Sequence, residues 1–428
     1  CTACGFKCHF ECEYDIQSSS CHPTVGLAAA AASSANMTPL KLVESSDGHQ
    51  LRRSISYNDL TRPLERRMEQ TFKFAGPISA MAASKRLIYI AVGGASSSLQ
   101  VLEKQSAKKM AEVSLDHSVS ALVMVDKTLW VGTSREVIQC IEAKDNKVET
   151  VRQLTGHKKG PMRALQRIGK YVWSVSPQEI CVWNRKEFKL HKYIPSDTVY
   201  NCILGCGDTV WCGSTVGMVF YDSQSFKKIK TPKEATATSI KFAIDKLVEI
   251  DTKDHQFVWA VHQTDNMISV WDVQAKKVHR SFEARRINDL FRLGDLVWTC
   301  SSDNMIRCID IGTLSVVREF SGAHDDSISC MCLIKSPECL KVWSGSLDHA
   351  ICIWKTEFKT HDWIPSDVKS GTCCICNKSL WGIGTVKTVK CKQCEMIAHL
   401  SCSDSLPVAA ICDRPSSPLS KLSPQTPR

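Results

Sequence analysis

A tryptophan that recurs about every 40 residues constrains the fold of this chain more than any other feature. The series consists of Trp130, Trp173, Trp211, Trp259, Trp298 and Trp343. Successive members are 43, 38, 48, 39 and 45 residues apart. A weaker unit without tryptophan, YIAVGG at 89–94, precedes Trp130 by a similar interval. Such intervals are typical of units built from four short strands, so we expect seven of these units.

The composition within a unit supports four strands. One unit reads SALVMV, TLWVGTS, VIQCIEA and VETVRQL, four β-branched or apolar segments separated by polar turn residues. A single unit cannot bury both of its faces, whereas units stacked radially cover one another and remove open edges on closure. We therefore expect an all-β fold with a seven-bladed β-propeller over residues 68–360. MEQTFKF at 68–74 is predicted to supply the outer strand of the last blade.

Several units resemble the WD-repeat family. The fullest match is GAHDDSISCMCLIKSPECLKVWSGSLDHAICIW, in which His324, Ser344, Asp348 and Trp354 occupy the positions of the family's structural hydrogen-bond tetrad. The resemblance implies that these side chains lock strands together within a blade. We therefore interpret His324 and Asp348 as structural residues and not as a catalytic pair.

Other units match this pattern in part. QTDNMISVWD retains Asp265 and Trp271, whereas SSDNMIRCID retains Asp303 but has Ile309 in place of the tryptophan. The third unit has His157, yet Pro-Gln-Glu stands where the turn aspartate is expected.

Cysteine and histidine residues after residue 360 have spacings typical of zinc ligands. Their order is His361-x11-Cys373-x2-Cys376-x14-Cys391-x2-Cys394-x4-His399-x2-Cys402-x9-Cys412. Eight nitrogen and sulfur ligands are enough for two tetrahedral sites, and thiolate with imidazole favours zinc over hard cations. The sequence therefore predicts a small domain over 361–412 that contains two structural zinc ions.

The ligand order, together with SLWG at 379–382, resembles the phorbol-ester/diacylglycerol-type (C1) zinc finger. In that family the two ligand sets interleave along the chain. The resemblance implies one zinc bound by Cys373, Cys376, His399 and Cys402, and a second bound by His361, Cys391, Cys394 and Cys412. Cys374 is then surplus.

The finger departs from the lipid-binding members of this family at two positions. Gly382 matches their pattern, but Ser370 and Lys387 replace the proline and glutamine that those members share. This departure favours an atypical finger, while diacylglycerol or anionic membranes stay open as partners. Leu380, Trp381 and Ile383 are predicted to form an apolar tip for membrane contact. Three lysines are expected to attract anionic headgroups: Lys387, Lys390 and Lys392.

The first 21 residues repeat the second half of the finger pattern, in the order Cys1-x2-Cys4-x4-His9-x2-Cys12-x8-Cys21. We interpret residues 1–21 as the C-terminal half of a second C1-type finger. It would bind two further zinc ions only when the finger is complete. Because the chain begins with Cys1 and not with Met, it is interpreted as an internal fragment of a longer protein.

Two polar segments are predicted to be disordered: a linker over 22–67 and a Ser/Pro-rich tail over 413–428. Their candidate phosphorylation sites are Ser56, Ser417, Ser423 and Thr426. The other eleven of the 23 cysteines are scattered from Cys140 to Cys352 on apolar stretches. We expect them to be small buried residues of the propeller.

Charge and motifs exclude several classes of function. The net charge is +10, but the basic residues are dispersed without an aromatic recognition module, so nucleic acid is not an expected partner. The chain lacks a signal peptide pattern and an apolar run of ~20 residues, so we expect a cytoplasmic location with peripheral membrane contact. It also lacks paired-carboxylate, nucleophile-elbow and phosphate-loop motifs, and we do not expect this stretch to be an enzyme.

Two functional hypotheses follow. The first is a zinc-binding signalling scaffold or adaptor, in which the propeller binds proteins such as small GTPases or kinases and the fingers dock to membranes or proteins. The alternative is the regulatory part of a multidomain signalling enzyme, a kinase or a Rho-type exchange factor, whose catalytic domain lies upstream of Cys1.

Overall fold

The computed structural model describes residues 68–403, except for 95–96, 145–146, 231–241, 253–254, 337–338, 357, 359–360, 369, 375–378, 381–386 and 393. The predictions for residues 1–67 and 404–428 therefore lie outside the described residues. These include the half finger with Cys1, Cys4, His9, Cys12 and Cys21, and the candidate sites Ser56, Ser417, Ser423 and Thr426. Among the described residues, no helix is long and apolar enough to cross a membrane.

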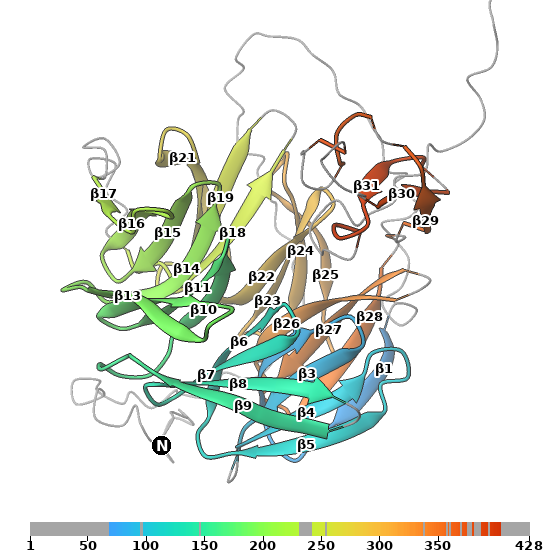
Figure 1. The fold of residues 1–428 in the computed structure, drawn as a ribbon, viewed down its shortest axis with the longest axis horizontal. Helices are drawn as coiled ribbons and strands as arrows, with labels where there is room; N and C mark the ends of the chain where they lie inside the picture. Colours follow the sequence, from blue (N-terminus) through green and yellow to red (C-terminus); the bar gives the residue numbers. More distant parts are fainter. Residues whose placement is uncertain are drawn as a thin grey trace, which may run out of the picture. The chain divides into compact units, whose positions relative to one another are not determined.

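The described chain forms seven antiparallel sheets of four strands and one smaller sheet (Figure 1). The first four sheets contain β2 (Ile78–Ala83), β3 (Leu87–Val92), β4 (Ser97–Glu103) and β5 (Lys109–Leu115); β6 (Val119–Val125), β7 (Thr128–Thr133), β8 (Val137–Lys144) and β9 (Lys147–Thr155); β10 (Ala164–Ile168), β11 (Tyr171–Ser176), β12 (Glu179–Asn184) and β13 (Lys189–Pro195); β14 (Tyr200–Cys206), β15 (Thr209–Ser214), β16 (Gly217–Asp222) and β17 (Lys228–Ile229).

The next three sheets contain β18 (Lys246–Asp251), β19 (Gln256–His262), β20 (Met267–Asp272) and β21 (Lys277–Glu283); β22 (Ile287–Leu293), β23 (Leu296–Ser301), β24 (Ile306–Asp310) and β25 (Val316–Phe320); β26 (Ile328–Lys335), β27 (Leu340–Ser346), β28 (Ala350–Lys355) and β1 (Met68–Lys73). The smaller sheet contains β29 (Trp363–Ser366), β30 (Thr388–Cys391) and β31 (Ile397–His399).

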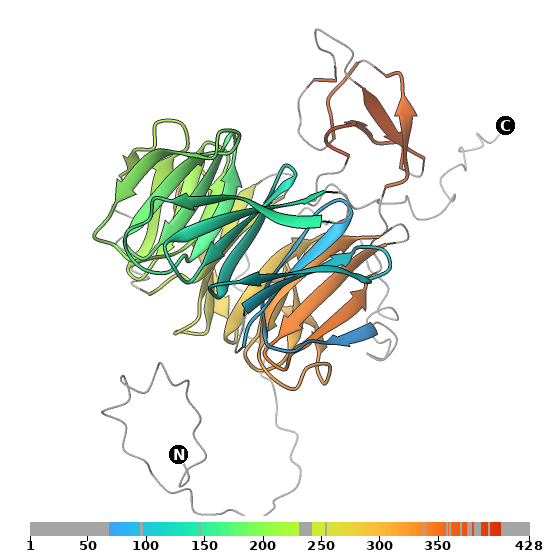
Figure 2. The same cartoon turned by 60° about the horizontal axis from the view of Figure 1, so that its bottom comes forward.

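Strands follow one another in chain order within each four-stranded sheet, except in the last. There β1, from the beginning of the described chain, pairs with β28, so that Phe72 lies opposite Ile351. Figure 2 shows this blue strand beside the orange sheet. The prediction that 68–74 supplies the outer strand of the last sheet is confirmed.

First strands of neighbouring sheets contact one another through the whole series. Each first strand contacts the first strands of the sheets before and after it, and β2 contacts both β6 and β26. Side chains of these first strands also accept backbone hydrogen bonds from the first strand of the next sheet. Gln166 of β10 accepts a hydrogen bond from the Gly205 N–H at 2.9 Å, and Asp289 of β22 accepts one from the Met331 N–H at 2.9 Å. The seven sheets therefore form a propeller-like series, as the repeat predicts.

Burial is greatest in the middle strands of each sheet and lowest in the outer strands. Every residue of β7, β11 and β23 is buried, which explains why these strands are nearly continuous apolar runs. In contrast, most residues of the outer strands β9 and β13 are exposed. The middle strands thus supply the core between neighbouring sheets.

Each recurring tryptophan packs against a phenylalanine. The ring centroids are 4.7 to 6.2 Å apart in the pairs Trp130–Phe188, Trp173–Phe226, Trp211–Phe220, Trp259–Phe282, Trp298–Phe320 and Trp343–Phe72. A pair of this kind contributes roughly 0.5–1.5 kcal/mol beyond the buried area. In the first two pairs the phenylalanine comes from the following sheet, so these contacts also join neighbouring sheets.

The turn between the third and fourth strands has the same form in five sheets. One residue in each turn has a positive φ and donates its N–H to a carbonyl four positions earlier: Ala107, Phe188, Phe226, Lys276 and Leu314. In four of these turns the residue at that earlier position is Asn or Asp, and its side chain accepts a further backbone N–H. The acidic residue in the WD dipeptide therefore fixes a turn.

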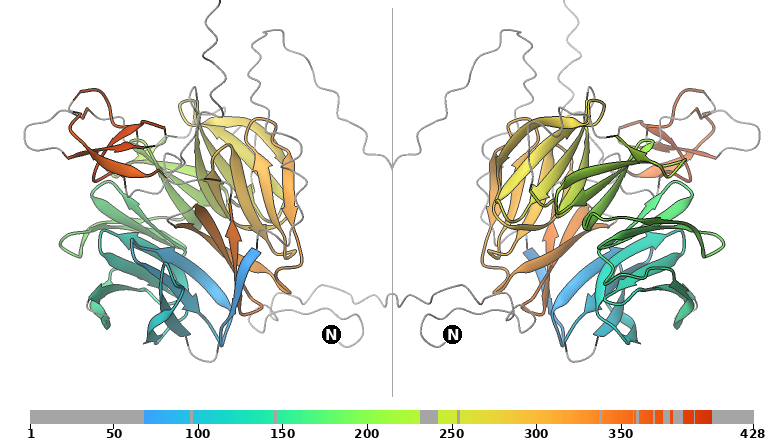
Figure 3. Two further views of the ribbon diagram at one scale, coloured as in Figure 1. Left: turned by 90° about the vertical axis from the view of Figure 1, so that its right-hand side faces the viewer. Right: turned by 90° about the vertical axis from the view of Figure 1, so that its left-hand side faces the viewer.

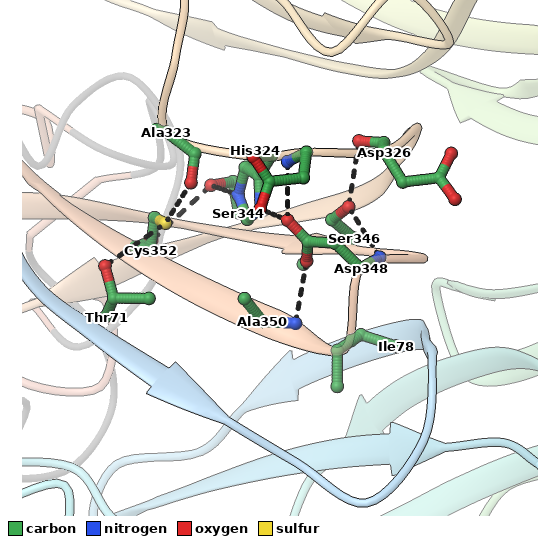
Figure 4. A network of polar contacts seen from close by, with 12 residues as sticks. Thr71, Ile78, Ala323, His324, Asp326, Ser344, Ser346, Asp348, Ala350 and Cys352 are labelled. Atoms are coloured by element: carbon green, nitrogen blue, oxygen red, sulfur yellow. Dashed lines mark hydrogen bonds and ion pairs between the residues drawn. The ribbon is translucent and has the colours of Figure 1, made fainter.

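The last four-stranded sheet contains the contacts that the WD-repeat resemblance implies (Figure 4). His324 lies 2.8 Å from Ser344 through Nε2 and 3.0 Å from Asp348 Oδ2 through Nδ1. The Trp354 indole N–H donates to Ser344 Oγ at 2.9 Å. Burial raises the pKa of Asp348, but N–H groups of Asp325 and Ala350 outweigh this effect and lower the pKa below its usual value. This hydrogen-bond relay of His324, Asp348, Ser344 and Trp354 links the loop before β26 to β27 and β28.

A glutamate completes the same relay in the third sheet. His157 Nε2 lies 2.6 Å from Ser174 Oγ, and the Trp183 indole N–H donates to the same oxygen at 2.7 Å. His157 Nδ1 lies 3.1 Å from Glu179 Oε1, which belongs to the Pro-Gln-Glu segment. The unit that lacks the turn aspartate therefore uses the longer carboxylate of Glu179.

The fifth sheet builds a relay from different strand positions. Ser269 of β20 lies 2.7 Å from His262 Nε2 and accepts the Trp271 indole N–H at 2.8 Å. Ala260 occupies the middle-strand position that corresponds to Ser344, and it lies directly opposite Ser269. In the fifth sheet the hydroxyl group therefore comes from the neighbouring strand, and it still contacts one histidine and one tryptophan.

Candidate zinc centres

The C-terminal sheet is a three-stranded unit in the order β29-β30-β31 (red in Figure 3). Trp363 lies opposite Cys391, and Thr388 lies opposite His399. The buried cluster of this unit consists of Cys373, Leu380, Val389 and Ala398. A core of this size contributes little folding free energy, so bound metal would contribute much of the stability of the unit.

The first candidate site consists of His361, Cys391 and Cys394, whose ligand atoms lie within 4.8 Å of one another. Cys394 Sγ is 3.2 Å from His361 Nδ1. The Lys392 N–H donates to the Asp362 carbonyl at 2.9 Å, which fixes the segment of His361 beside the Cys-x2-Cys knuckle. The Trp363 ring packs on His361 with centroids 4.5 Å apart and orients the imidazole.

The second candidate site consists of Cys373, His399 and Cys402, again within 4.8 Å. Cys402 Sγ is 3.7 Å from His399 Nδ1, and the His399 backbone N–H donates to Cys373 Sγ at 3.4 Å. His399 Nε2 lies 3.0 Å from the Ser379 carbonyl oxygen. Because a carbonyl oxygen only accepts hydrogen bonds, the neutral imidazole carries its proton on Nε2. Nδ1 is then unprotonated beside the sulfur atoms.

Both sites fit zinc. A tetrahedral zinc with bonds of ~2.3 Å to sulfur and ~2.1 Å to nitrogen separates the two ligand atoms by about 3.6 Å. The observed Sγ–Nδ1 distances of 3.2 and 3.7 Å are close to this value. The carbonyl bond to His399 is the outer contact that zinc-binding histidines commonly make. Sulfur and imidazole donors also favour zinc over hard cations.

The two triads are the described members of the two interleaved ligand sets that the sequence predicts. The fourth member of each set, Cys412 in the first and Cys376 in the second, lies outside the described residues.

The predicted exposure of Leu380 at a membrane tip is wrong. Its side chain is only 2% exposed and packs against Cys373, Val389 and Ala398. The Leu380 N–H donates to the Gly371 carbonyl at 3.0 Å, which returns this segment to the core. The other two predicted tip residues, Trp381 and Ile383, lie outside the described residues.

Exposed apolar and basic side chains of the finger occur elsewhere. Ile364, Met396 and Leu400 are 36%, 44% and 45% exposed, and none of them belongs to a motif of the sequence. Lys390 lies 3.3 Å from Glu395, and Lys392 lies 3.3 Å from Asp362. Two of the three predicted headgroup-binding lysines therefore have acidic neighbours. Lys387 is exposed, as is Lys392.

The eleven cysteines from Cys140 to Cys352 are reduced thiols in the described part of the chain. Ten are buried and Cys332 is half-buried, so the prediction that they are small residues of the core is confirmed. Burial raises the pKa of the Cys140 and Cys181 thiols to about 12. These thiols therefore remain protonated and unreactive at neutral pH.

Comparisons with known proteins agree with this site. Residues 361–413 match the family described as the phorbol esters/diacylglycerol binding domain (C1 domain). The chain is also 24% identical over 235 residues to a probable serine/threonine-protein kinase, pats1, of Dictyostelium discoideum. That match covers 36% of this chain and 7% of the kinase. The interleaved triads and the family match together identify residues 361–413 as a C1 domain with two zinc sites.

Proposed function

We propose that this chain is a docking module of intracellular signalling, in which the C1 domain binds a membrane or a protein and the propeller-like sheets bind proteins. The observation that carries the proposal is the C1 domain itself, with its two triads of zinc ligands. Domains held together by structural zinc present rigid loops at their surface. In this proposal the stretch acts by binding and not by catalysis.

Anionic membranes are the favoured target of the C1 domain. Lys387 replaces the glutamine that diacylglycerol-binding members share, and its side chain is exposed. An exposed lysine beside the apolar Leu400 suits contact with a negatively charged surface. The Lys387 carbonyl accepts the Leu400 N–H at 2.8 Å, so the two residues are held together.

Liposome sedimentation of the zinc-loaded chain tests this proposal. We expect binding to vesicles of phosphatidylcholine with phosphatidylserine, little gain when diacylglycerol is added, and a several-fold loss in Lys387→Glu. Lys277→Glu, in the outer strand β21, is the matched charge control. Binding that requires diacylglycerol would contradict the atypical assignment, and an absence of binding to all vesicles would leave protein docking as the role of the domain.

The propeller-like sheets are proposed as the protein-binding platform, with small GTPases and kinases as partner classes. Buried polar relays hold the loop before the first strand in two sheets, at His157 and His324. Loops held this way offer a fixed surface to a partner. Affinity purification with the full chain, compared with a Lys158→Glu and Lys159→Glu loop variant, tests this assignment. Recovery of the same proteins with both forms would exclude that loop surface.

A second candidate is the regulatory part of a multidomain signalling enzyme. The similarity to a protein named as a probable kinase supports it, because the matched stretch is only 7% of that protein. The catalytic domain would then lie upstream of Cys1. Sequencing of the complete transcript, followed by a kinase and nucleotide-exchange assay of the encoded protein, tests this candidate. A transcript without either catalytic domain would leave the adaptor proposal.

A further inference from the structure

Strand β21 forms the outer edge of the fifth sheet (Figure 1). It pairs with β20 on one side, where Phe282 lies opposite Ile268, and no strand of the described residues pairs with its other side. Backbone N–H and C=O groups along that side can therefore pair with a further strand. Seven residues of β21 span roughly 23 Å, which is long enough to pair with a short extended peptide.

The exposed side chains of this edge are mainly cationic. Residues 277–286 contain four cations and one carboxylate, which leaves an excess of three positive charges. Lys277 and Arg280 of β21 are exposed, and so are Arg285 and Arg286 directly after the strand. None of these four side chains forms an ion pair within the described part of the chain. Asp272 lies opposite Lys277, but its carboxylate accepts the Ala275 N–H at 2.6 Å in the β20–β21 turn.

In two other outer strands the charged side chains are paired within the sheet. Lys109 of β5 lies 2.6 Å from Glu112 of the same strand, and Glu319 of β25 lies 2.7 Å from Arg307 of the neighbouring strand. Such pairs leave little net charge at an edge. The cations of β21 instead act together on any charged group that approaches the strand.

The backbone that carries these cations is held in place. The Ala284 N–H donates to the Asn266 carbonyl at 2.7 Å, and the Arg286 N–H donates to the Asn266 side-chain oxygen at 3.1 Å. Within β21, the Phe282 ring packs on Trp259 with centroids 5.2 Å apart. A fixed strand edge loses less conformational entropy when a ligand binds.

We propose that β21 binds an extended acidic segment of a partner protein, which adds a fifth strand to this sheet. The inference rests on the proposed protein-binding role of the sheets and names a surface other than the loop of Lys158 and Lys159. The backbone of the ligand would pair with the open side of β21, while its carboxylates would contact Lys277, Arg280 and the two arginines after the strand.

The chemistry of this edge favours a peptide over other partners. Lipid headgroups and nucleic acid phosphates can neutralise the cations, but they cannot form the ladder of hydrogen bonds that an open strand offers. A second copy of β21 has the backbone groups but carries the same charges, so repulsion opposes pairing between two copies of this chain. An acidic extended segment satisfies both requirements.

Fluorescence anisotropy of the full zinc-loaded chain tests the proposal, with a labelled peptide of about ten alternating glutamate and valine residues as the probe. We expect saturable binding that weakens as the KCl concentration rises. Lys277→Glu/Arg280→Glu should weaken it at least about tenfold, because both substitutions turn attraction into repulsion. Lys147→Glu/Arg152→Glu makes the same charge change on exposed positions of the outer strand β9 and should bind like the unchanged chain. Equal thermal midpoints of the two variants separate charge from folding.

A second probe tests the strand pairing itself. The same peptide with N-methyl groups on alternate backbone amides keeps its charges but cannot donate hydrogen bonds to β21. We expect it to bind at least about tenfold more weakly than the unmethylated peptide. Hydrogen exchange of the complex with the unmethylated peptide should show added protection of backbone amides within β21. Equal binding of the two peptides would overturn the addition of a strand.

The failure of this inference can be distinguished from failure of the proposed function. Partners recovered by affinity purification, with no binding of the acidic peptide, would overturn the β21 site and leave protein docking in place. Equal peptide binding by Lys277→Glu/Arg280→Glu and the unchanged chain would also overturn it. Loss of phosphatidylserine vesicle binding in that variant would assign the edge to membranes, against the proposal.

Discussion

Glu179 Oε1 lies 3.1 Å from His157 Nδ1 in the buried interior of the third sheet. The same oxygen accepts the backbone N–H groups of Lys158 and Lys159, while the Tyr193 hydroxyl donates to the other carboxylate oxygen at 2.7 Å. One glutamate thus satisfies a loop, a histidine and an outer strand. It performs the task that Asp348 performs in the last sheet.

Substitution of Glu179 by Ala should destabilise the protein by about 2–4 kcal/mol, because it leaves the loop N–H groups without their acceptor. Urea denaturation followed by tryptophan fluorescence measures this difference. Glu149→Ala, an exposed residue of β9, should change the stability by no more than about 0.5 kcal/mol. Equal stability of the two variants would show that the Glu179 contacts contribute nothing to folding.

Stability should also depend on pH through Glu179. Burial opposes its ionisation, but hydrogen bonds from Tyr193, Lys158, Lys159 and Ser176 lower the pKa of Glu179 from 4.5 to about 2. The folded pKa lies below the unfolded one, so this contribution is present above pH 4.5 and is lost as the pH falls toward 2. We expect a loss of about 2 kcal/mol between pH 5 and pH 3, measured by urea denaturation. Glu179→Gln should lack this component, and an identical pH profile would contradict the assignment.

A single and a double variant test the position of the Ser269 hydroxyl in the fifth sheet. Ser269→Ala removes the partner of the Trp271 N–H and of His262 Nε2, while His262 Nδ1 keeps its contact with the Ala243 carbonyl, and the change should cost about 1–3 kcal/mol. The double variant Ala260→Ser/Ser269→Ala returns the hydroxyl to the strand where the last sheet has Ser344. It should recover at least half of the lost unfolding free energy. A double variant less stable than the single one would show that the relay requires the present geometry.

The zinc content of the protein should fall when a ligand is removed from one of the two triads. Cys391→Ala removes a ligand of the first site and should release at least one zinc ion per chain, measured by elemental mass spectrometry. The three-stranded C1 unit should lose its protection from proteolysis, because its core is small. Cys374→Ala, the surplus cysteine beside the second site, should retain the full zinc content. Loss of equal amounts of zinc from both variants would contradict the ligand assignment.

Removal of β1 should weaken the last four-stranded sheet. A chain that begins at Phe74 loses the β1–β28 ladder, the Lys341–Glu69 ion pair and the Phe72–Trp343 contact. We expect its thermal midpoint to fall by about 10 °C, measured by scanning calorimetry. A chain that begins at Met68 keeps these contacts and serves as the control. Equal midpoints would mean that β1 is dispensable.

Periodicity and spacing predict most of the architecture. The recurring tryptophan indicates seven units because burial of both faces of a middle strand demands continuous apolar residues at a regular interval. The ligand spacing likewise predicts both zinc triads. The His324 tetrad was predictable because its sequence pattern is retained in full.

The remaining features depend on contacts between distant residues. Glu179 replaces an aspartate through its extra methylene group, and Ser269 acts from the strand opposite the expected one. Neither of these two replacements changes the pattern of apolar residues along the chain, so that pattern does not reveal them. The sequence predicts that Leu380 lies at the surface because it precedes Trp381 in an apolar segment, whereas a backbone hydrogen bond to Gly371 returns it to the core.

The pairing of β1 with β28 has a consequence for biosynthesis. Thr71 contacts Cys352, a residue 281 positions further along the chain. At roughly 5–20 residues per second, a ribosome needs on the order of 15–60 s to make the intervening chain. During that time six sheets can form while β1 has no partner. Among the described strands, β1 is thus the first to be synthesised and the last to pair. Its pairing with β28 completes the final sheet.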